Sequence, residues 1–475
     1  MKILISGIVF VRRLPKRYMT LWLLSIVVSV VTQAQRSARF NDQRALEDYS
    51  HLRDSINLIW SNAIKYVALD KQKNSYLSIG GSVRPRYELL TNQRWIPENN
   101  QSYYSQRIAV HTDWRLGKYV RLFGELQHGY VSQGYTFLQS DDLAVHQGFL
   151  ELKNNAQNLS FRLGRQEMRF GEGRLYDFGK GPNIRRTFDI GKFTFSQGKT
   201  NIQAFYGKAV RGDFGIFDNE FNLFKANTQN QIVWGVYTQF QLLPNEGEAD
   251  NTEIYYLGLE TGRATFNDVT GEENRHTIGI RRYGQVGARF TYNTELIYQF
   301  GYLADNTISA FNIETDWQYS LVDKKGRPTF GLKLDWSSGD AAVADGKINS
   351  FNPMFVNPAI YSLAVVNTPV NLLSIHPAFT IFPSKKMIVE IEYVFFFRAS
   401  LADGLYAPPN RLTLMSSALN DRHIGNSIGL LVVYNFDKHF NFTLRTSYYR
   451  AGDFVTNSGL AKDIFQFSPT FQYTF

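Results

Sequence analysis

From residue 74 to residue 475, apolar and polar side chains alternate with a period of two. In one stretch, Ile108 and Trp114 share an apolar parity, whereas the intervening positions are polar. Arg107 and Asp113 belong to that polar parity. Because successive side chains of a β-strand point to opposite faces of a sheet, each such stretch predicts a strand with one apolar and one polar face. This part of the chain is therefore predicted to be all-β.

Eighteen stretches of this kind follow one another, and the connections between them alternate in length. Tight turns such as 117–118 and 437–438 alternate with longer segments such as 167–186 and 339–370. Short turns, long loops and an even number of strands of about ten residues are typical of a transmembrane β-barrel. A sheet in lipid cannot leave its edges open, so the strands are expected to close. The predicted strands are residues 74–90, 103–116, 119–131, 144–154, 158–166, 187–196, 199–209, 230–243, 252–263, 274–283, 286–301, 308–322, 327–338, 371–382, 386–397, 422–436, 439–449 and 464–475.

Aromatic side chains support a membrane location for these strands. Tyrosine and tryptophan are expected at both membrane interfaces, and here they fall near strand ends on the apolar parity. Those residues are Trp114, Tyr298, Trp336, Tyr448 and Tyr473. A secreted β-sandwich or propeller is the alternative, but its strands would be shorter and its turns would not alternate short and long. The sequence predicts an 18-stranded antiparallel transmembrane β-barrel with short periplasmic turns and long extracellular loops.

Residues 1–34 predict a cleaved secretory signal peptide. Basic residues at positions 12–17 precede an apolar run at 21–31, and a small-residue pattern ends at Ala34. The apolar run is too short to span a bilayer comfortably, so an uncleaved anchor is the less favoured alternative. Five of the positive charges behind the formal net charge of +9 lie in this segment, so +4 remains, and a nucleic-acid partner loses its main support.

Residues 35–73 predict a polar periplasmic lead-in to the barrel at residues 74–475. It has a few apolar residues around Trp60, which favour one or two amphipathic turns, and a disordered tether is the alternative. Between Lys347 and Lys385 the chain has no charged residue but five prolines, which exclude a spanning helix. We expect a long external loop and one strand there, and the loop either folds into the pore or stays on the surface.

The chemistry of enzymes and cofactors is missing from the sequence. No cysteine is present, which excludes disulfides, zinc ribbons, iron-sulfur clusters and thiol nucleophiles. The eight histidines stand singly, without metal-binding spacing, and no phosphate-binding glycine loop occurs. Asp141 and Asp142 offer too few carboxylates for calcium, so a solvated acidic loop is favoured. The sequence predicts no enzyme, cofactor or metal site.

Charged side chains on the inner parity divide into two groups. The first five strands carry Arg84, Arg86, Arg107, Arg115, Arg121, Lys153 and Arg162, together with Glu88, Asp113, Glu125 and Glu151. Strands eleven to fifteen carry Glu295, Glu314, Asp316, Asp335, Glu390 and Glu392, against only Arg289 and Lys333. In a ring of eighteen strands these groups face each other across the lumen, which predicts a basic wall opposite an acidic wall. Arginines in a pore select anions and bind carboxylates or phosphates with two parallel hydrogen bonds. Alternatively, the charges pair with one another in a filled lumen.

The stretch Gly-Arg-Gln-Glu-Met-Arg-Phe-Gly-Glu-Gly-Arg-Leu at residues 164–175 resembles the signature of the alginate export family of outer-membrane barrels. Arginines on the early strands and Gly-Pro-Asn-Ile-Arg at 181–185 agree with this resemblance, which extends over residues 74–215. It implies a monomeric barrel with an arginine-rich constriction for a polyuronate. The matching arginines are Arg84, Arg107, Arg121, Arg162 and Arg165, and the signature adds Arg169 and Arg174. Arg165 has lipid-facing parity, so a bulge redirects it or it lies at the interface. The acidic wall departs from a lumen suited to a polyanion.

These observations predict a channel in the bacterial outer membrane for an anionic polysaccharide or another anionic solute. The alternatives are a general porin, an oligosaccharide-uptake channel, a surface-binding barrel without conductance and a barrel hydrolase. The expected partners are outer-membrane lipid, the anionic solute and a periplasmic secretion protein. The direction of transport, the gating and the substrate stay open at this stage.

Overall fold

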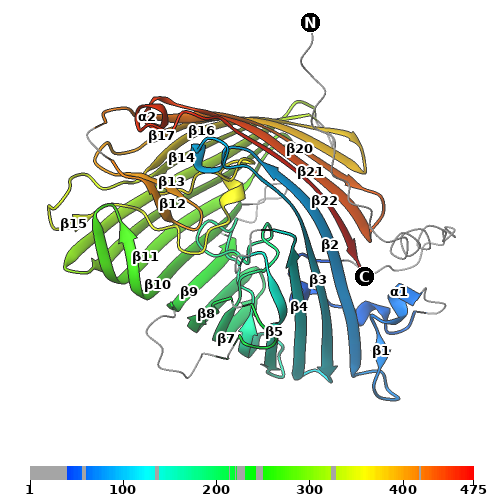
Figure 1. The fold of residues 1–475 in the computed structure, drawn as a ribbon. Coiled ribbons are helices and arrows are strands. Elements are labelled where there is room, and N and C mark those ends of the chain that lie inside the picture. Colours follow the sequence, from blue (N-terminus) through cyan, green and yellow to red (C-terminus); the bar gives the residue numbers. More distant parts are fainter. Residues whose placement is uncertain are drawn as a thin grey trace, which may run out of the picture. The chain divides into compact units, whose positions relative to one another are not determined.

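A computed structural model describes residues 40–55, 60–133, 138–212, 214–219, 221, 231–241, 250–322, 328–416 and 419–475. The predicted signal peptide lies outside these residues. Eighteen strands, each antiparallel to its neighbours, form a closed barrel, which confirms the predicted fold class (Figure 1). The barrel strands are β2 (Tyr76–Leu90), β3 (Gln101–Leu116), β4 (Val120–Val131), β5 (Asp141–Lys153), β6 (Leu159–Gln166), β7 (Phe188–Gln197), β8 (Thr200–Ala209), β9 (Ile232–Gln241), β10 (Asp250–Phe266), β11 (Val269–Val286), β12 (Phe290–Leu303), β13 (Asn306–Ser320), β14 (Thr329–Ser337), β16 (Leu372–Ser384), β17 (Met387–Arg398), β20 (His423–Asn435), β21 (Phe440–Ala451) and β22 (Ile464–Thr474).

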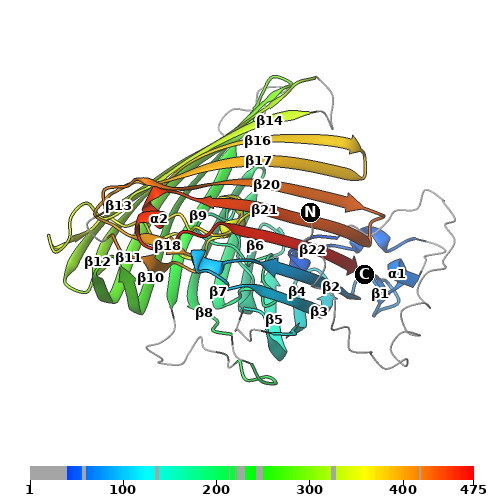
Figure 2. The same cartoon turned by 45° about the horizontal axis from the view of Figure 1, so that its top comes forward.

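The barrel closes where the first strand meets the last. Strand β2 pairs with β22, and Val83 stands opposite Tyr473 in this ladder. Figure 2 shows β2 and β22 side by side, with β21 and β20 beyond them. At the end of the seam, the backbone N–H groups of Gly81 and Phe475 each donate to the other residue's carbonyl oxygen, at 2.9 and 3.0 Å. Closure leaves no unpaired strand edge in the lipid.

Burial along the strands follows the period of two. In β3, His111 and Asp113 are only 3% and 4% exposed, whereas Val110 and Trp114 are 44% and 39% exposed. This is the pattern of a barrel whose apolar side chains face lipid and whose polar side chains face the interior. The aromatic residues predicted for the interfaces lie on the outer face, since Tyr298, Trp336 and Tyr448 are exposed.

Short elements occupy the connections and the N-terminal segment. No helix among the described residues is long and apolar enough to cross a membrane. The short elements are η1 (Arg44–Leu46), η2 (Ser50–Leu52), α1 (Trp60–Ala63), β1 (Val67–Ala68), η3 (Gln93–Trp95), β15 (Lys347–Ile348), η4 (Pro358–Ile360), β18 (Leu405–Ala407), β19 (Arg411–Leu414) and α2 (Asp453–Asn457).

Two long connections fold into the barrel. We call residues 167–187, between β6 and β7, the signature loop, and residues 338–371, between β14 and β16, the long loop. Tyr176 of the first and Phe355 of the second form a parallel bridge. Both rings are buried in a cluster that also contains Phe205 and Leu257 of the barrel wall. The uncharged segment therefore folds into the pore, which decides between the two alternatives left open by its sequence.

Candidate functional site

The basic wall holds one end of the signature loop. Arg84 donates to the carbonyl oxygens of Lys180, Gly181 and Pro182 at 2.6, 2.9 and 2.9 Å, and to Oδ1 of Asn183 at 3.1 Å. Arg107, which stands directly opposite Arg84 in the β2–β3 ladder, donates to the Pro182 carbonyl at 3.3 Å. Two like charges opposite each other repel, and the loop carbonyls place negative dipoles between them.

Arg86 contacts the same part of the signature loop. Its Nη1 donates to the Gly181 carbonyl at 2.9 Å, and its Nη2 forms an ion pair with Glu88 at 2.9 Å. Arg84, Arg86 and Arg107 are thus brought together by the loop that carries the family signature. All three lie on the inner wall, as their parity predicts, and their donors are directed at backbone oxygens of the loop.

The middle of the signature loop crosses to the acidic wall. Gly171 and Gly173 have φ angles of +52° and +86°, a backbone conformation that residues with a Cβ rarely adopt. They allow the tight turn that presents Arg174. Its guanidinium is 2.7 Å from Glu295 and 2.5 Å from Glu314, and all three side chains are nearly fully buried. Arg174, which the sequence placed among the anion-binding arginines, is therefore the counterion of the acidic wall.

Strand register explains why this cation is needed. Glu295 of β12 stands opposite Glu314 of β13, and Glu314 stands opposite Asp335 of β14. Carboxylates directly opposite each other on one face are destabilising. Arg174 neutralises the first pair, and Asp335 accepts hydrogen bonds from Asn312 at 2.8 Å and Ser337 at 3.0 Å.

The remaining acidic residues of this wall have other partners. Glu392 lies 2.9 Å from Nε2 of His376 and accepts the backbone N–H of Leu363 in the long loop at 2.7 Å. Glu390 accepts from Thr380 at 3.0 Å. Asp316 stands opposite Lys333 in the β13–β14 ladder. Lys333 in turn donates to the Ile360 carbonyl, which anchors the long loop to this wall.

Three further arginines predicted to line the pore are paired with carboxylates of the wall itself. Arg121 is 2.6 Å from Asp113 and 3.4 Å from Glu151. Arg162 is 2.6 Å from Glu151. Arg165 forms two hydrogen bonds with Asp189 at 2.8 and 3.0 Å, and both residues are buried. Arg165 therefore contacts protein rather than lipid. Arg169 is more exposed and lies 3.5 Å from Asp177 within the signature loop.

An open cavity of about 760 Å³ lies between the signature loop, the long loop and the β18–β19 hairpin, at the long-loop end of the barrel. We call this cavity the vestibule. Its arginines are Arg185, Arg186, Arg211, Arg263 and Arg411. Among the described residues that line it, Glu273 is the only acidic one, and Glu273 is already paired with Arg275 at 2.5 Å. Arg263 and Arg411 are exposed, and neither forms an ion pair with another described residue.

Sequence reasoning did not identify the vestibule arginines. They lie in or beside loops, where the period of two no longer assigns a side chain to a face. The one available signal was Arg185 at the end of the Gly-Pro-Asn-Ile-Arg stretch, which was noted only as part of the resemblance.

Glu167, the first residue of the signature loop, is an ionisable group with an altered environment. It is buried, 2.6 Å from Arg185 and 2.8 Å from His146. Burial raises the pKa of Glu167 to about 7, although Arg185 acts in the opposite direction. The part of the chain that the structure describes has no group of three or more His, Asp or Glu side chains arranged to hold a metal ion.

Solved structures with the same fold are outer-membrane proteins. A BenF-like porin from Pseudomonas fluorescens Pf-5 gives a TM-score of 0.55 at 14% identity, over 84% of this chain and 98% of that chain. OccK11 (OpdR) of Pseudomonas aeruginosa gives 0.54 at 12%, over 85% and 96%. OpdK of Pseudomonas aeruginosa, solved with vanillate, gives 0.52 at 12%, over 84% and 98%. At these identities the likeness concerns the fold. No curated protein matches the chain.

The closed barrel, its lipid-facing apolar surface and these neighbours define the fold of an outer-membrane β-barrel. The model of a family described as "Alginate export" matches residues 75–465. The chain belongs to the alginate export family, and its location is the bacterial outer membrane. The resemblance in the signature is thereby confirmed. The family and the fold are those of transport channels.

Proposed function

We propose that this channel conducts an anionic solute, such as a polysaccharide that carries carboxylates, across the outer membrane. The observation that carries the proposal is the vestibule, which has five arginines and, among its described lining residues, one carboxylate that is already paired. A cavity lined by one sign of charge concentrates counterions and raises their rate of entry. Arginine also binds carboxylates with two parallel hydrogen bonds, which favours this class of anion over chloride.

A relative with the same fold gives further support. OpdK of Pseudomonas aeruginosa was solved with vanillate, which is a carboxylate. The alginate export family to which the chain belongs points to a polymer of such groups. The arginines of the inner wall are held by loop carbonyls and wall carboxylates, so we assign the first contact with the solute to Arg263 and Arg411.

The test is ion selectivity in planar bilayers, measured as the reversal potential across a gradient of potassium chloride. Wild type is expected to prefer chloride. The double variant R263A/R411A should lose this preference several-fold, because two exposed cations leave the vestibule. The matched control is K385A, which removes an exposed cation in the turn between β16 and β17, at the opposite end of the barrel. It should leave the preference almost unchanged.

Three outcomes contradict the proposal. Preference for potassium in the wild type would exclude an anion channel. An equal effect of K385A and R263A/R411A would show that the vestibule has no special role. Absence of any conductance would favour a surface-binding barrel, which the packed loops inside the lumen make the second candidate.

A further inference from the structure

The N-terminal segment enters the periplasmic mouth of the barrel. Residues 40–53 carry η1 and η2, and Ala45 packs against Phe123 and Phe149, which belong to the inner faces of β4 and β5. The nearest connection, residues 117–119 between β3 and β4, is one of the short periplasmic turns. The part of the segment around Ala45 thus lies on the basic wall, near the periplasmic end of the lumen.

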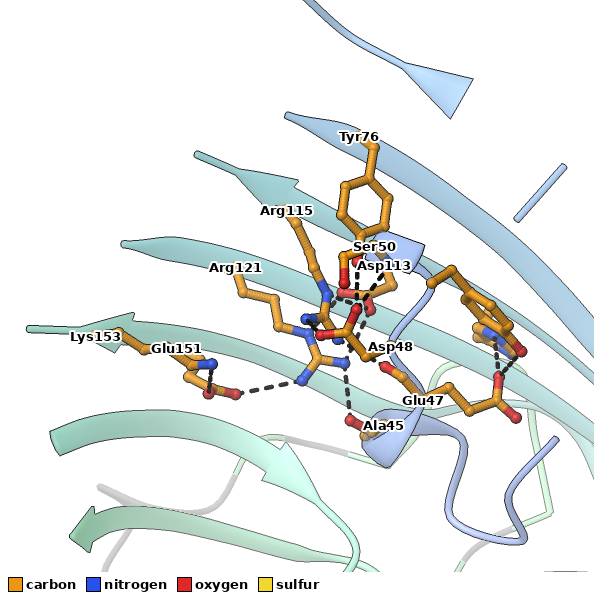
Figure 3. Close-up of polar contacts among 12 residues, drawn as sticks. Ala45, Glu47, Asp48, Ser50, Tyr76, Asp113, Arg115, Arg121, Glu151 and Lys153 are labelled. Atoms are coloured by element: carbon orange, nitrogen blue, oxygen red, sulfur yellow. Dashed lines mark hydrogen bonds and ion pairs between the residues drawn. The ribbon is translucent and has the colours of Figure 1, made fainter. Parts of the chain in front are cut away.

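Oxygen atoms of this segment accept hydrogen bonds from cationic side chains of the wall and of the signature loop. A carboxylate oxygen of Asp48 and the carbonyl oxygen of Glu47 accept from Arg115 at 2.6 and 2.7 Å. The carbonyl oxygen of Ala45 accepts from Arg121 at 2.8 Å. Figure 3 shows these acceptors converging on the two guanidinium groups, beside Asp113 and Glu151.

Asp42 makes the corresponding contacts deeper in the lumen. Its carboxylate is 2.7 Å from Nζ of Lys180, and its carbonyl oxygen accepts from Arg185 at 2.7 Å. Arg185 also lines the vestibule, so the cationic side chains that contact the segment lie next to those of the proposed entry site. Lys180 belongs to the stretch of the signature loop that Arg84 holds.

The segment has the chemistry of a short anionic polymer. Between residues 40 and 50 it has three carboxylates, those of Asp42, Glu47 and Asp48, and a single cation, Arg44. Arg44 pairs with Glu47 at 2.7 Å, which leaves the carboxylates of Asp42 and Asp48 for cations outside the segment. Burial alone would raise the pKa values of Asp42 and Asp48, but Lys180 and Arg115, respectively, hold them below the usual value. Both carboxylates are therefore charged at neutral pH.

We propose that Arg115 and Lys180 form a carboxylate-binding subsite on the periplasmic side of the vestibule, and that residues 40–50, through the carboxylates of Asp48 and Asp42, occupy it as an internal competitor of the transported anion. The inference rests on the proposed function, because it assumes that the transported solute carries carboxylates. It adds a second binding site, on the periplasmic side of the vestibule, and a ligand of this chain that must leave before the solute binds there.

The contacts of the segment allow its acidic part to leave. In the Asp42–Lys180 pair the side chains are 49% and 58% exposed, and Asp48 is 52% exposed, so solvent and salt weaken both ion pairs. The following part of the chain is held separately. Ile64 accepts the backbone N–H of Ile79 at 2.8 Å, and Lys65 donates to the Phe475 carbonyl at 3.0 Å. Arg44 donates to the same Phe475 carbonyl at 2.9 Å and pairs with the buried Glu47. Arg44, Glu47 and residues 60–68 can therefore stay in place while the exposed carboxylates of Asp42 and Asp48 leave their cations.

Two substitutions across one ion pair provide the test. D42N removes the competitor and leaves the subsite, whereas K180A removes part of the subsite. The probe is trigalacturonate added on the periplasmic side of a bilayer, with block of the ionic current as the readout and maltotriose as the neutral control. We expect D42N to bind the probe about two- to five-fold more tightly and K180A about two- to five-fold more weakly, the range for an exposed ion pair.

Matched controls are D345N, at an exposed carboxylate in the long loop, and K385A, at an exposed lysine of a periplasmic turn. Neither should change the block. If D42N and K180A shift the affinity in the same direction, the pair is merely structural and the inference is overturned. If trigalacturonate blocks neither the wild type nor any variant, while chloride preference is also absent, the proposed function itself fails.

Discussion

The basic wall and the acidic wall both place like charges opposite each other, but the signature loop compensates them in different ways. Arg84 stands opposite Arg107, and the loop supplies neutral carbonyl dipoles to them. Glu295 stands opposite Glu314, and the loop supplies the full charge of Arg174. The loop carbonyls accept hydrogen bonds from several N–H groups of these arginines but leave the net charge of the arginines in place. The guanidinium group cancels one of the opposing negative charges.

This difference shows how a lumen with two charged walls can still favour anions. The acidic wall is partly neutralised by a buried counterion, whereas Arg84 and Arg107 have no carboxylate within ion-pair distance among the described residues. The remaining positive charge then adds to that of the vestibule. Four substitutions test this difference between the walls, and we expect the largest effect from the first.

Replacement of Arg174 should have the largest effect. R174A leaves two buried carboxylates opposite each other without their cation. Removing one partner of a buried ion pair costs about 3–5 kcal/mol of the free energy of unfolding. The measurement is the temperature at which the folded, fast-migrating form on gels converts to the unfolded form. R174K keeps the charge and should lose less. Unfolding of R174A at the wild-type temperature would contradict the assigned counterion.

Replacement of Arg84 should have a smaller effect. R84A removes four hydrogen bonds to the signature loop, but water can replace them at the exposed Lys180, and repulsion from Arg107 is relieved. We expect a loss of about 1–2 kcal/mol. Limited trypsin digestion should cut faster after Lys180, because this part of the loop loses its anchor. Cleavage at the wild-type rate would show that Arg86 and Arg107 suffice.

Replacement of Glu167 should change the pH dependence of stability. Because the pKa of this buried carboxyl is about 7 in the folded chain, above its unfolded value, the folded state retains the proton longer than the unfolded state. The stabilisation that the protonated Glu167 carboxyl gives the folded state is fully present below the unfolded pKa. It is lost as pH rises toward about 7. As pH rises over this range, the unfolding temperature of the wild type should therefore fall relative to that of E167Q. A constant difference would contradict the raised pKa.

Replacement of Asp335 should have the smallest effect. This carboxylate has amide and hydroxyl donors, from Asn312 and Ser337, instead of a cation. D335N keeps the shape and removes the repulsion from Glu314, so the free energy of unfolding should stay within about 1 kcal/mol of wild type. The gel assay used for R174A measures this as well. A loss as large as that of R174A would mean that the two walls do not differ as described.

Alternating side chains were sufficient to predict the barrel. The prediction for β9, residues 230–243, differs by only two residues at each end from the observed Ile232–Gln241. Parity also placed Arg84, Arg107 and Glu314 inside, where the structure has them buried. It succeeded because a one-residue shift in register would turn every charged side chain of a strand into the lipid.

The loops and the N-terminal segment could not be predicted in this way. Nothing in the period of two shows that Arg174 crosses to Glu295 and Glu314, or that Asp42 reaches Lys180, because these contacts join distant parts of the chain. Local periodicity in the sequence was enough to predict the barrel, the membrane location and the two groups of charged residues on the inner face. Which of these charges are compensated became clear only from the folded chain, because compensation depends on where two long loops and a short acidic segment fold within the lumen.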